Sequence, residues 1–233
     1  MLSDSLFLIL GVQSLFMNDN SFLFIIELIG TFAFAVSGIR VAANKRVDLF
    51  GAYVVGLVTA IGGGTMRDLM LDVTPFWMLT PVYLVITGIS LVLVIVMGKH
   101  LSRLEGTFFI FDTIGLAFFV VVGMQKSLAE DYPFWVAIIM GTFTGAFGGI
   151  LRDILVNDLP LIFRKDIYAS ACIIGGLIYW GLDAAGFNDI VCQSATAAGV
   201  ILTRVAAVRF HWSLPTLKGD TGNVGNDNCK QPD

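Results

Sequence analysis

This chain carries a series of apolar runs, each about as long as the hydrocarbon core of a membrane is thick. A transmembrane helix needs roughly 20 consecutive apolar residues, and seven such runs lie between clusters of charged and turn-forming residues. They span residues 22–43, 50–72, 80–98, 107–125, 133–157, 167–185 and 189–208. Their hydrophobicity is continuous and does not alternate, which favours helices over barrel strands. We therefore expect an all-α polytopic membrane protein with seven transmembrane helices.

The composition excludes several other classes of protein. Of 233 residues, 56% are hydrophobic and 14% charged, whereas soluble domains have about 25% charged residues. A net charge of −4 offers no basic surface for nucleic acid. The three cysteines have no CxxC spacing, so we expect neither a disulfide framework nor a zinc site. No GxxxxGK[ST], HExxH or GxSxG motif is present, and we expect no enzyme and no cofactor.

The distribution of basic residues predicts the orientation. With the N-terminus outside, eleven of the fourteen Lys and Arg residues lie on the inner side or at the C-terminal end. They are Arg40, Lys45, Arg46, Lys99, Arg103, Arg164, Lys165, Arg204, Arg209, Lys218 and Lys230. Only Lys126 lies outside. It could move in the transmembrane field, although snorkelling to the interface is the ordinary role of such a lysine. Because basic residues favour the cytoplasmic side, we expect a cytoplasmic C-terminus.

A sequence repeat divides the chain. The segment GGGTMRDLMLDVTP at 62–75 aligns without gaps with FGGILRDILVNDLP at 147–160, a constant offset of 85 residues. The same offset pairs Gly30 with Gly115, Phe34 with Phe119, and Tyr83 with Tyr168. Each copy holds three spans, and an odd number inverts the second copy in the membrane.

This repeat predicts the organisation of the whole chain. An N-terminal tail would occupy 1–21, and the first and second three-helix repeats 22–106 and 107–188. A seventh helix at 189–212 and a polar tail at 213–233 would follow. The N-terminal tail has no basic residue before its apolar stretch, unlike a secretory signal peptide.

Glycines precede a charged pair in both repeats. Adjacent glycines weaken a helix and mark bends, and a bent span exposes backbone groups only toward protein or water. We expect a pore-lining bend at each motif, close helix packing being the alternative. The glycines concerned are Gly62, Gly63, Gly64, Gly148 and Gly149.

The charged pairs Arg67–Asp68 and Arg152–Asp153 lie inside spans. Each such charge costs about 2.5–3.5 kcal/mol on insertion scales, so all four must be paired or hydrated. Neighbours point about 100° apart on a helix, which disfavours pairing within each Arg–Asp pair. We expect pairing between repeats or with other acids, in a structural cluster or a hydrated constriction.

Further polar residues lie in the apolar runs. Glu27 and Asp112 occupy equivalent positions in the first span of each repeat, where they would attract cations or pair with the arginines. Four hydroxyl residues could line a pore or join helices. These are Ser37, Thr59, Thr65 and Thr144.

The doubled signatures ELIGTFAFAVSG…GGGTMRD…P and FDTIGLAFFVVVG…FGGILRD…P resemble the prokaryotic members of the trimeric intracellular cation (TRIC) channel family. The resemblance covers about residues 22–212. It implies a homotrimer in a bacterial inner membrane, with a pore inside each protomer lined by spans 1, 2, 4 and 5. The implied activity is conduction of monovalent cations, chiefly potassium. The lysine-glutamate-valine motif of the animal members is not evident.

A second function stays open, because the same family domain is also described as a glycine transporter. Interrupted helices could present amide groups to a carboxylate while acids meet an ammonium group. A transporter of glycine or another small amino acid is therefore the alternative to a channel. A scaffold without transport would need no buried charge, and we rank it last.

Overall fold

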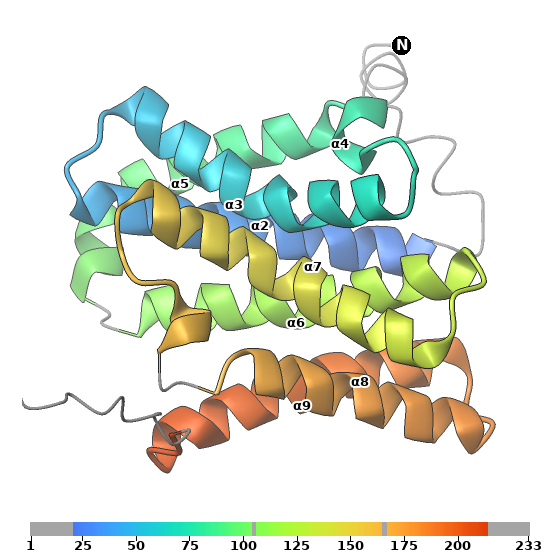
Figure 1. The fold of residues 1–233 in the computed structure, drawn as a ribbon. Coiled ribbons are helices and arrows are strands. Elements are labelled where there is room, and N and C mark those ends of the chain that lie inside the picture. The colour runs from blue at the N-terminus through green and yellow to red at the C-terminus, as the bar shows by residue number, and fades with distance from the viewer. Residues whose placement is uncertain (1–20, 104–105, 165–166, 214–233) are drawn as a thin grey trace, which may run out of the picture.

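The computed structural model describes residues 21–103, 106–164 and 167–213, and the described part is helical without strands. The expected tails, apart from Ser21 and Ser213, lie outside these residues. Helix labels follow Figure 1, in which numbering begins at α2. The long helices are α2 (Ser21–Asn44), α3 (Leu49–Met70), α5 (Val82–Arg103), α6 (Thr107–Ala129), α7 (Phe134–Leu155), α8 (Ala169–Ala184) and α9 (Asp189–Arg209). Two short helices, α4 (Phe76–Leu79) and the 3₁₀ helix η1 (Leu161–Phe163), follow α3 and α7.

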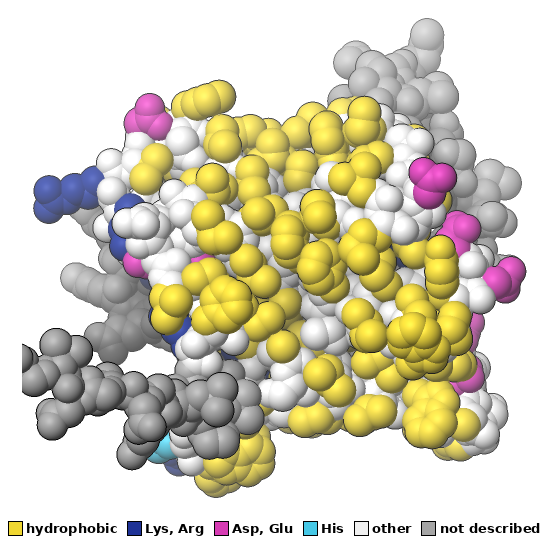
Figure 2. All heavy atoms as spheres, in the orientation of Figure 1, with side chains coloured by type: hydrophobic (Ala, Val, Ile, Leu, Met, Phe, Trp, Pro, Cys, Tyr) yellow, Lys and Arg dark blue, Asp and Glu magenta, His cyan; other side chains and the backbone are white. Residues whose placement is uncertain are grey.

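The helices have the lengths and surfaces of membrane helices. Within the described ranges, α2, α3, α6, α7 and α9 are long and apolar enough to cross a membrane, and α8 and the apolar part of α5 are shorter. Each expected span contains one long helix, with ends that agree within five residues. A broad band of hydrophobic side chains covers the face shown in Figure 2, with charged side chains at its two ends. The prediction of an all-α membrane protein is confirmed.

The helices form one bundle in which α2 and α6 are central. α2 packs on α3, α5 and α6, while α6 packs on α2, α7 and α9. α3 and α7 contact each other across the bundle, and α8 and α9 form a pair along one side (Figure 1). Stacked rings of Phe34 and Phe119, with centroids 5.4 Å apart, join α2 to α6. The bundle core therefore lies between the helices of the two sequence copies.

The backbone repeats its local geometry at the 85-residue offset. Arg46 and Asp131 both have positive φ, and so do Asp72 and Asn157. Each follows the end of a helix, where a backbone amide beyond the end donates to a carbonyl of the last turn. Examples are the Val73 amide, which donates to the Asp68 carbonyl, and the Asp158 amide, which donates to the Asp153 carbonyl. These are left-handed helix terminations, which non-glycine residues adopt at some cost. Two segments related in sequence thus end their helices in the same way.

The glycine motifs lie where α3 and α7 approach most closely. A Cβ atom on Gly63 would collide with the carbonyl oxygen of Thr144, and one on Gly148 with that of Thr59. Helix continues through both motifs, from Leu49 to Met70 in α3 and from Phe134 to Leu155 in α7. The structure thus shows the close helix packing that was the alternative, without a break in either helix, and a pore-lining bend stays a prediction. Missing side chains allow backbone-to-backbone packing, and intact helical hydrogen bonds avoid unpaired polar groups in an apolar interior.

Candidate functional site: two buried charge clusters

The first charge cluster consists of Glu27, Arg67, Asp68 and Lys126, from α2, α3 and α6. Arg67 Nε donates to Asp68 Oδ1 at 2.8 Å, and its Nη2 lies 3.8 Å from Glu27 Oε1. Lys126 Nζ donates to the same Glu27 oxygen at 3.0 Å, and the Tyr83 hydroxyl donates to Oε2 at 3.1 Å. The Arg67 side chain is 0% exposed and that of Lys126 is 29% exposed. Two cations and two carboxylates thus balance.

The second charge cluster consists of Asp112, Arg152, Asp153 and Arg204, from α6, α7 and α9. Arg152 Nη1 donates to Asp112 Oδ1 at 2.6 Å and to Ser37 Oγ at 2.9 Å. Arg152 Nε donates to Asp153 Oδ1 at 2.8 Å. Arg204 Nη2 donates to Asp112 Oδ2 at 3.2 Å. This cluster also holds two cations and two carboxylates, and all four residues are buried.

The expectation that neighbouring Arg and Asp residues do not pair is wrong. In each cluster the arginine Nε donates to the aspartate that follows it. The arginine side chain is long enough to fold back along its own helix while its outer nitrogens reach an acid on α2 or α6. The expected pairing of Arg67 with Glu27 and of Arg152 with Asp112 is present. Each guanidinium is therefore shared between two carboxylates, as a fully buried charge requires.

Each aspartate of the charged pairs also holds the chain segment that follows its helix. Asp68 Oδ2 accepts the backbone N–H of Phe76 at 2.8 Å, and Asp153 Oδ2 accepts that of Leu161 at 3.0 Å. Both amides come directly after the repeated proline, which has no N–H of its own. The distant proline of the sequence motif therefore belongs to the same local structure as the aspartate. One carboxylate oxygen neutralises arginine, and the other fixes the chain.

The predicted hydroxyl residues lie within helix contacts. Thr59 and Thr144 are buried and donate to Val55 and Met140 carbonyls one turn back in their own helices. Thr65 donates to the carbonyl of Ile61 and accepts from Trp77 Nε1. Among the four, Ser37 joins a charge cluster, as an acceptor for Arg152.

Two pockets approach the clusters from opposite ends of α2 and α6. The Glu27 pocket, of about 290 Å³, is lined by Glu27, Tyr83 and Lys126, among others. The Asp153 pocket, of about 430 Å³, lies at the other end and is lined by Lys45, Asp153 and other residues. Arg67 and Arg152 are fully buried and line neither pocket. Each pocket thus ends at one balanced charge cluster.

The ends of the molecule differ in charge (Figure 2). Exposed Lys45, Arg46 and Arg164 lie at the end that holds the Asp153 pocket. At the end that holds the Glu27 pocket, the loops after α3 and α6 expose acids, including Asp72 and Asp131. Lys45 Nζ also pairs with Asp158 Oδ1 at 2.8 Å, which joins the loops after α2 and α7.

Two residues of the clusters, and Tyr83 that donates to Glu27, were not predicted as site residues. Arg204 was counted among the cytoplasmic charges, although it falls inside the apolar run 189–208. A charge inside an apolar run must be paired or hydrated, so its position could have identified Arg204 as a site residue. The sequence left Lys126 either to move in the transmembrane field or to snorkel, and the structure pairs it with Glu27. Tyr83 matches Tyr168 at the repeat offset, which was a further signal. The structure places the Tyr168 ring 4.6 Å from the Arg204 guanidinium carbon.

The described residues contain no group of three or more His, Cys, Asp and Glu side chains able to hold a metal ion. Cys172 and Cys192 are buried free thiols, and Cys229 lies outside the described residues.

Comparisons with known proteins agree with this architecture. The sequence model of a family described as "Glycine transporter" matches twice, at residues 24–99 and 109–184. The chain is 40% identical over 201 residues to a UPF0126 membrane protein of Vibrio cholerae, covering 85% of this chain and 84% of that protein. It is also 40% identical over 200 residues to the UPF0126 inner membrane protein YadS of Escherichia coli, covering 84% and 96%.

Solved structures are similar along nearly the same length. The TRIC trimeric intracellular cation channel orthologue from Rhodobacter sphaeroides has a TM-score of 0.78 and 33% identity, covering 82% of this chain and 99% of that one. A prokaryotic TRIC channel crystallised in 0.5 M KCl has a TM-score of 0.76 and 26% identity, covering 82% and 98%. The chain therefore belongs to the UPF0126 membrane proteins, the prokaryotic members of the trimeric intracellular cation (TRIC) channel family.

Proposed function

We propose that this protein is a passive channel for monovalent cations, selective for potassium, with a pore inside each protomer. The observation that carries this proposal is the pair of pockets that enter one chain from opposite ends and stop at balanced charge clusters. Solved structures similar to this chain are cation channels rather than enzymes, which supports a role in transport and not in catalysis.

The charge balance removes a barrier that unpaired arginines would raise against cations. At an effective dielectric constant near 20, one positive charge 4 Å from a potassium ion would raise its energy by about 4 kcal/mol. Arg67 pairs with Glu27 of one pocket and Arg152 with Asp153 of the other, and unpaired they would block cations. Glu27 and Asp68 offset Arg67 together with Lys126, and two acids offset the arginines of the second cluster. Potassium and sodium ions are the proposed permeant species.

We place the pore between α2, α3, α6 and α7, which correspond to spans 1, 2, 4 and 5. The three-helix repeats at 22–106 and 107–188 would be related by an axis in the membrane plane, with 189–212 as the added seventh helix. The recurring helix terminations and reciprocal glycine contacts support this division. Because α3 and α7 meet at Gly63 and Gly148, opening requires their separation or sliding at that contact.

We propose seven membrane crossings with the N-terminus outside and the C-terminus in the cytoplasm. The basic end, with Lys45, Arg46 and Arg164, would face the cytoplasm, as the positive-inside rule favours. A homotrimer in lipid is the proposed assembly, since the similar structures are described as trimeric. Its location would be the bacterial inner membrane, where a relative is named as a resident protein.

Transport of glycine is the alternative function, supported by the family description and by one buried group. Arg67 Nη1 has no hydrogen-bond partner among the described residues, although the side chain is fully buried, and a guanidinium suits a substrate carboxylate. However, α3 and α7 are uninterrupted, so no free helix end is offered at the glycine motifs to bind that carboxylate. The channel therefore stands as the main proposal.

Recording from purified protein in planar bilayers tests the two functions. Discrete potassium currents with a reversal potential that follows the potassium gradient are the expected result. Uptake of labelled glycine into proteoliposomes is measured in parallel. Silent bilayers together with saturable glycine uptake would overturn the channel in favour of the carrier.

A further inference from the structure

Arg204 is a buried cation supplied by the helix that lies outside the two sequence copies. It is on α9, about four turns from the start of the helix, and its side chain is 4% exposed. Its Nη2 lies 3.2 Å from Asp112 Oδ2, its Nε 3.5 Å from Thr113 Oγ1, and its Nη1 3.4 Å from the Ile167 carbonyl oxygen. These distances are at the long end of the hydrogen-bond range. By contrast, Arg152 holds the other oxygen of Asp112 at 2.6 Å.

The two charge clusters obtain their second cation from different sources. In the first cluster it is Lys126 of α6, whose equivalent 85 residues earlier is Val41. Valine provides no charge, so the pseudo-symmetric arrangement alone would leave the second cluster one cation short. Arg204 makes up this difference from α9. Without it, Asp112 and Asp153 would face Arg152 alone, with one net negative charge.

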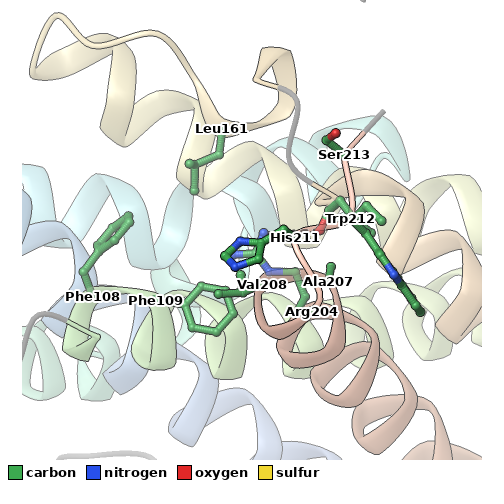
Figure 3. A pocket seen from close by; sticks show the side chains of 10 residues that line it. Phe108, Phe109, Leu161, Arg204, Ala207, Val208, His211, Trp212 and Ser213 are labelled. Atoms are coloured by element: carbon green, nitrogen blue, oxygen red, sulfur yellow. Dashed lines mark hydrogen bonds between the residues drawn. The ribbon is translucent and has the colours of Figure 1, made fainter. Parts of the chain in front are cut away.

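Arg204 lines a further pocket, which shares Phe108 and Leu161 with the Asp153 pocket. This pocket, of about 350 Å³, is lined by Arg204 together with Phe109, His211 and other residues of α6 and the end of α9. Figure 3 shows Arg204 and His211 toward the middle of this lining, with Phe108, Leu161 and Ser213 around them. The guanidinium carbon already lies 5.0 Å from the centroid of the Phe109 ring, a cation–π contact that would persist during a short rotation. This pocket offers space into which the Arg204 side chain could turn.

We propose that Arg204 is a removable counter-charge, a positioning residue that determines whether Asp112 is available to cations. Paired with Asp112, Arg204 neutralises the second cluster, which then has no net charge to attract a cation at the inner end of the Asp153 pocket. When Arg204 turns into the pocket beside α9, the freed Asp112 oxygen leaves one net negative charge. Asp112 is one helical turn from Phe108, which lines the Asp153 pocket, so a cation there is stabilised. This inference rests on the proposed channel function.

A purely structural ion pair makes a different prediction from a removable one. Neutralising one partner of a structural buried pair reduces folding and assembly, and leaves the properties of any assembled channel unchanged. A removable counter-charge alters the open–closed equilibrium and its dependence on salt. Salt dependence is informative because mobile ions screen the field of a hydrated site.

The test compares single-channel recordings of assembled Arg204→Gln, Arg204→Lys and wild-type protein. We expect Arg204→Gln to raise open probability about tenfold, which equals about 1.4 kcal/mol in the open–closed equilibrium. Its conductance should exceed that of the wild type by more at low than at high potassium concentration. Arg204→Lys keeps the positive charge, so its open probability should be close to that of the wild type. The matched control is Arg209→Gln, which removes one exposed charge from the same helix and should behave as wild type.

Two outcomes would overturn the proposal. One is a correctly assembled Arg204→Gln channel with wild-type open probability and salt dependence; the other is an Arg204→Lys channel as open as Arg204→Gln. If Arg204→Gln does not assemble, the charge-balanced Asp112→Asn/Arg204→Gln variant is recorded instead. Its open probability should equal that of the wild type. A higher open probability of this double variant contradicts the proposal. Silent wild-type protein would instead refute the channel function itself.

Discussion

Substitution of Gly63 by alanine tests whether the glycine motifs act through close packing. The added Cβ would overlap the carbonyl oxygen of Thr144, a backbone atom that cannot rotate away as a side chain could. α3 and α7 must then separate along their contact. Overpacking of this kind costs about 1–3 kcal/mol, and a backbone clash belongs in the upper part of that range. The better helix propensity of alanine returns up to about 1 kcal/mol, so we expect a net loss of about 2 kcal/mol.

Gly88 provides the matched control, because it lies in the interior of α5 and a Cβ there would meet nothing within 4 Å. Gly88→Ala should therefore leave stability unchanged or raise it by up to about 1 kcal/mol. The assay is reversible unfolding in mixed detergent micelles with increasing dodecyl sulfate, followed by far-ultraviolet circular dichroism. If Gly63→Ala is as stable as Gly88→Ala, the close contact of α3 and α7 does not explain the motif.

Three further predictions concern single positions. Asp68→Asn should destabilise the fold by about 3–5 kcal/mol or prevent assembly, because it deprives the buried Arg67 of its nearest acid. The control Lys45→Gln, at a largely exposed pair, should cost at most about 1 kcal/mol. Equal losses of the two variants in the same unfolding assay would contradict a stabilising role of the first charge cluster. Asp131→Gly should stabilise by about 1 kcal/mol, since Asp131 has a φ of 59° after the negative end of α6, and a lower unfolding midpoint would refute it. Phe34→Ala should cost about 3–5 kcal/mol by opening a cavity against Phe119; a loss below about 1 kcal/mol would show that the site collapses.

The amino-acid sequence was sufficient to predict the positions of the helices and to align the two halves of the chain. Runs of about 20 apolar residues have few alternatives to helix, because lipid leaves backbone groups without other partners. The offset of 85 residues then identified Arg67 with Arg152 and Glu27 with Asp112 as equivalent residues. The cost of a buried charge predicted that each arginine would pair, between repeats or with the acid of the first span, and the structure shows the second of these.

The tertiary structure alone decided which further groups join each cluster. Lys126 comes from a helix of the second sequence copy to complete the first cluster, and Arg204 comes from α9 to complete the second. It also decided that Gly63 and Gly148 pack against backbone without interrupting their helices. A periodic pattern specifies which face and what depth a residue occupies along its own helix. Which distant helix approaches that face, and how closely, depends on the mutual packing of all the helices, so the partners of a buried charge are settled only when the bundle forms.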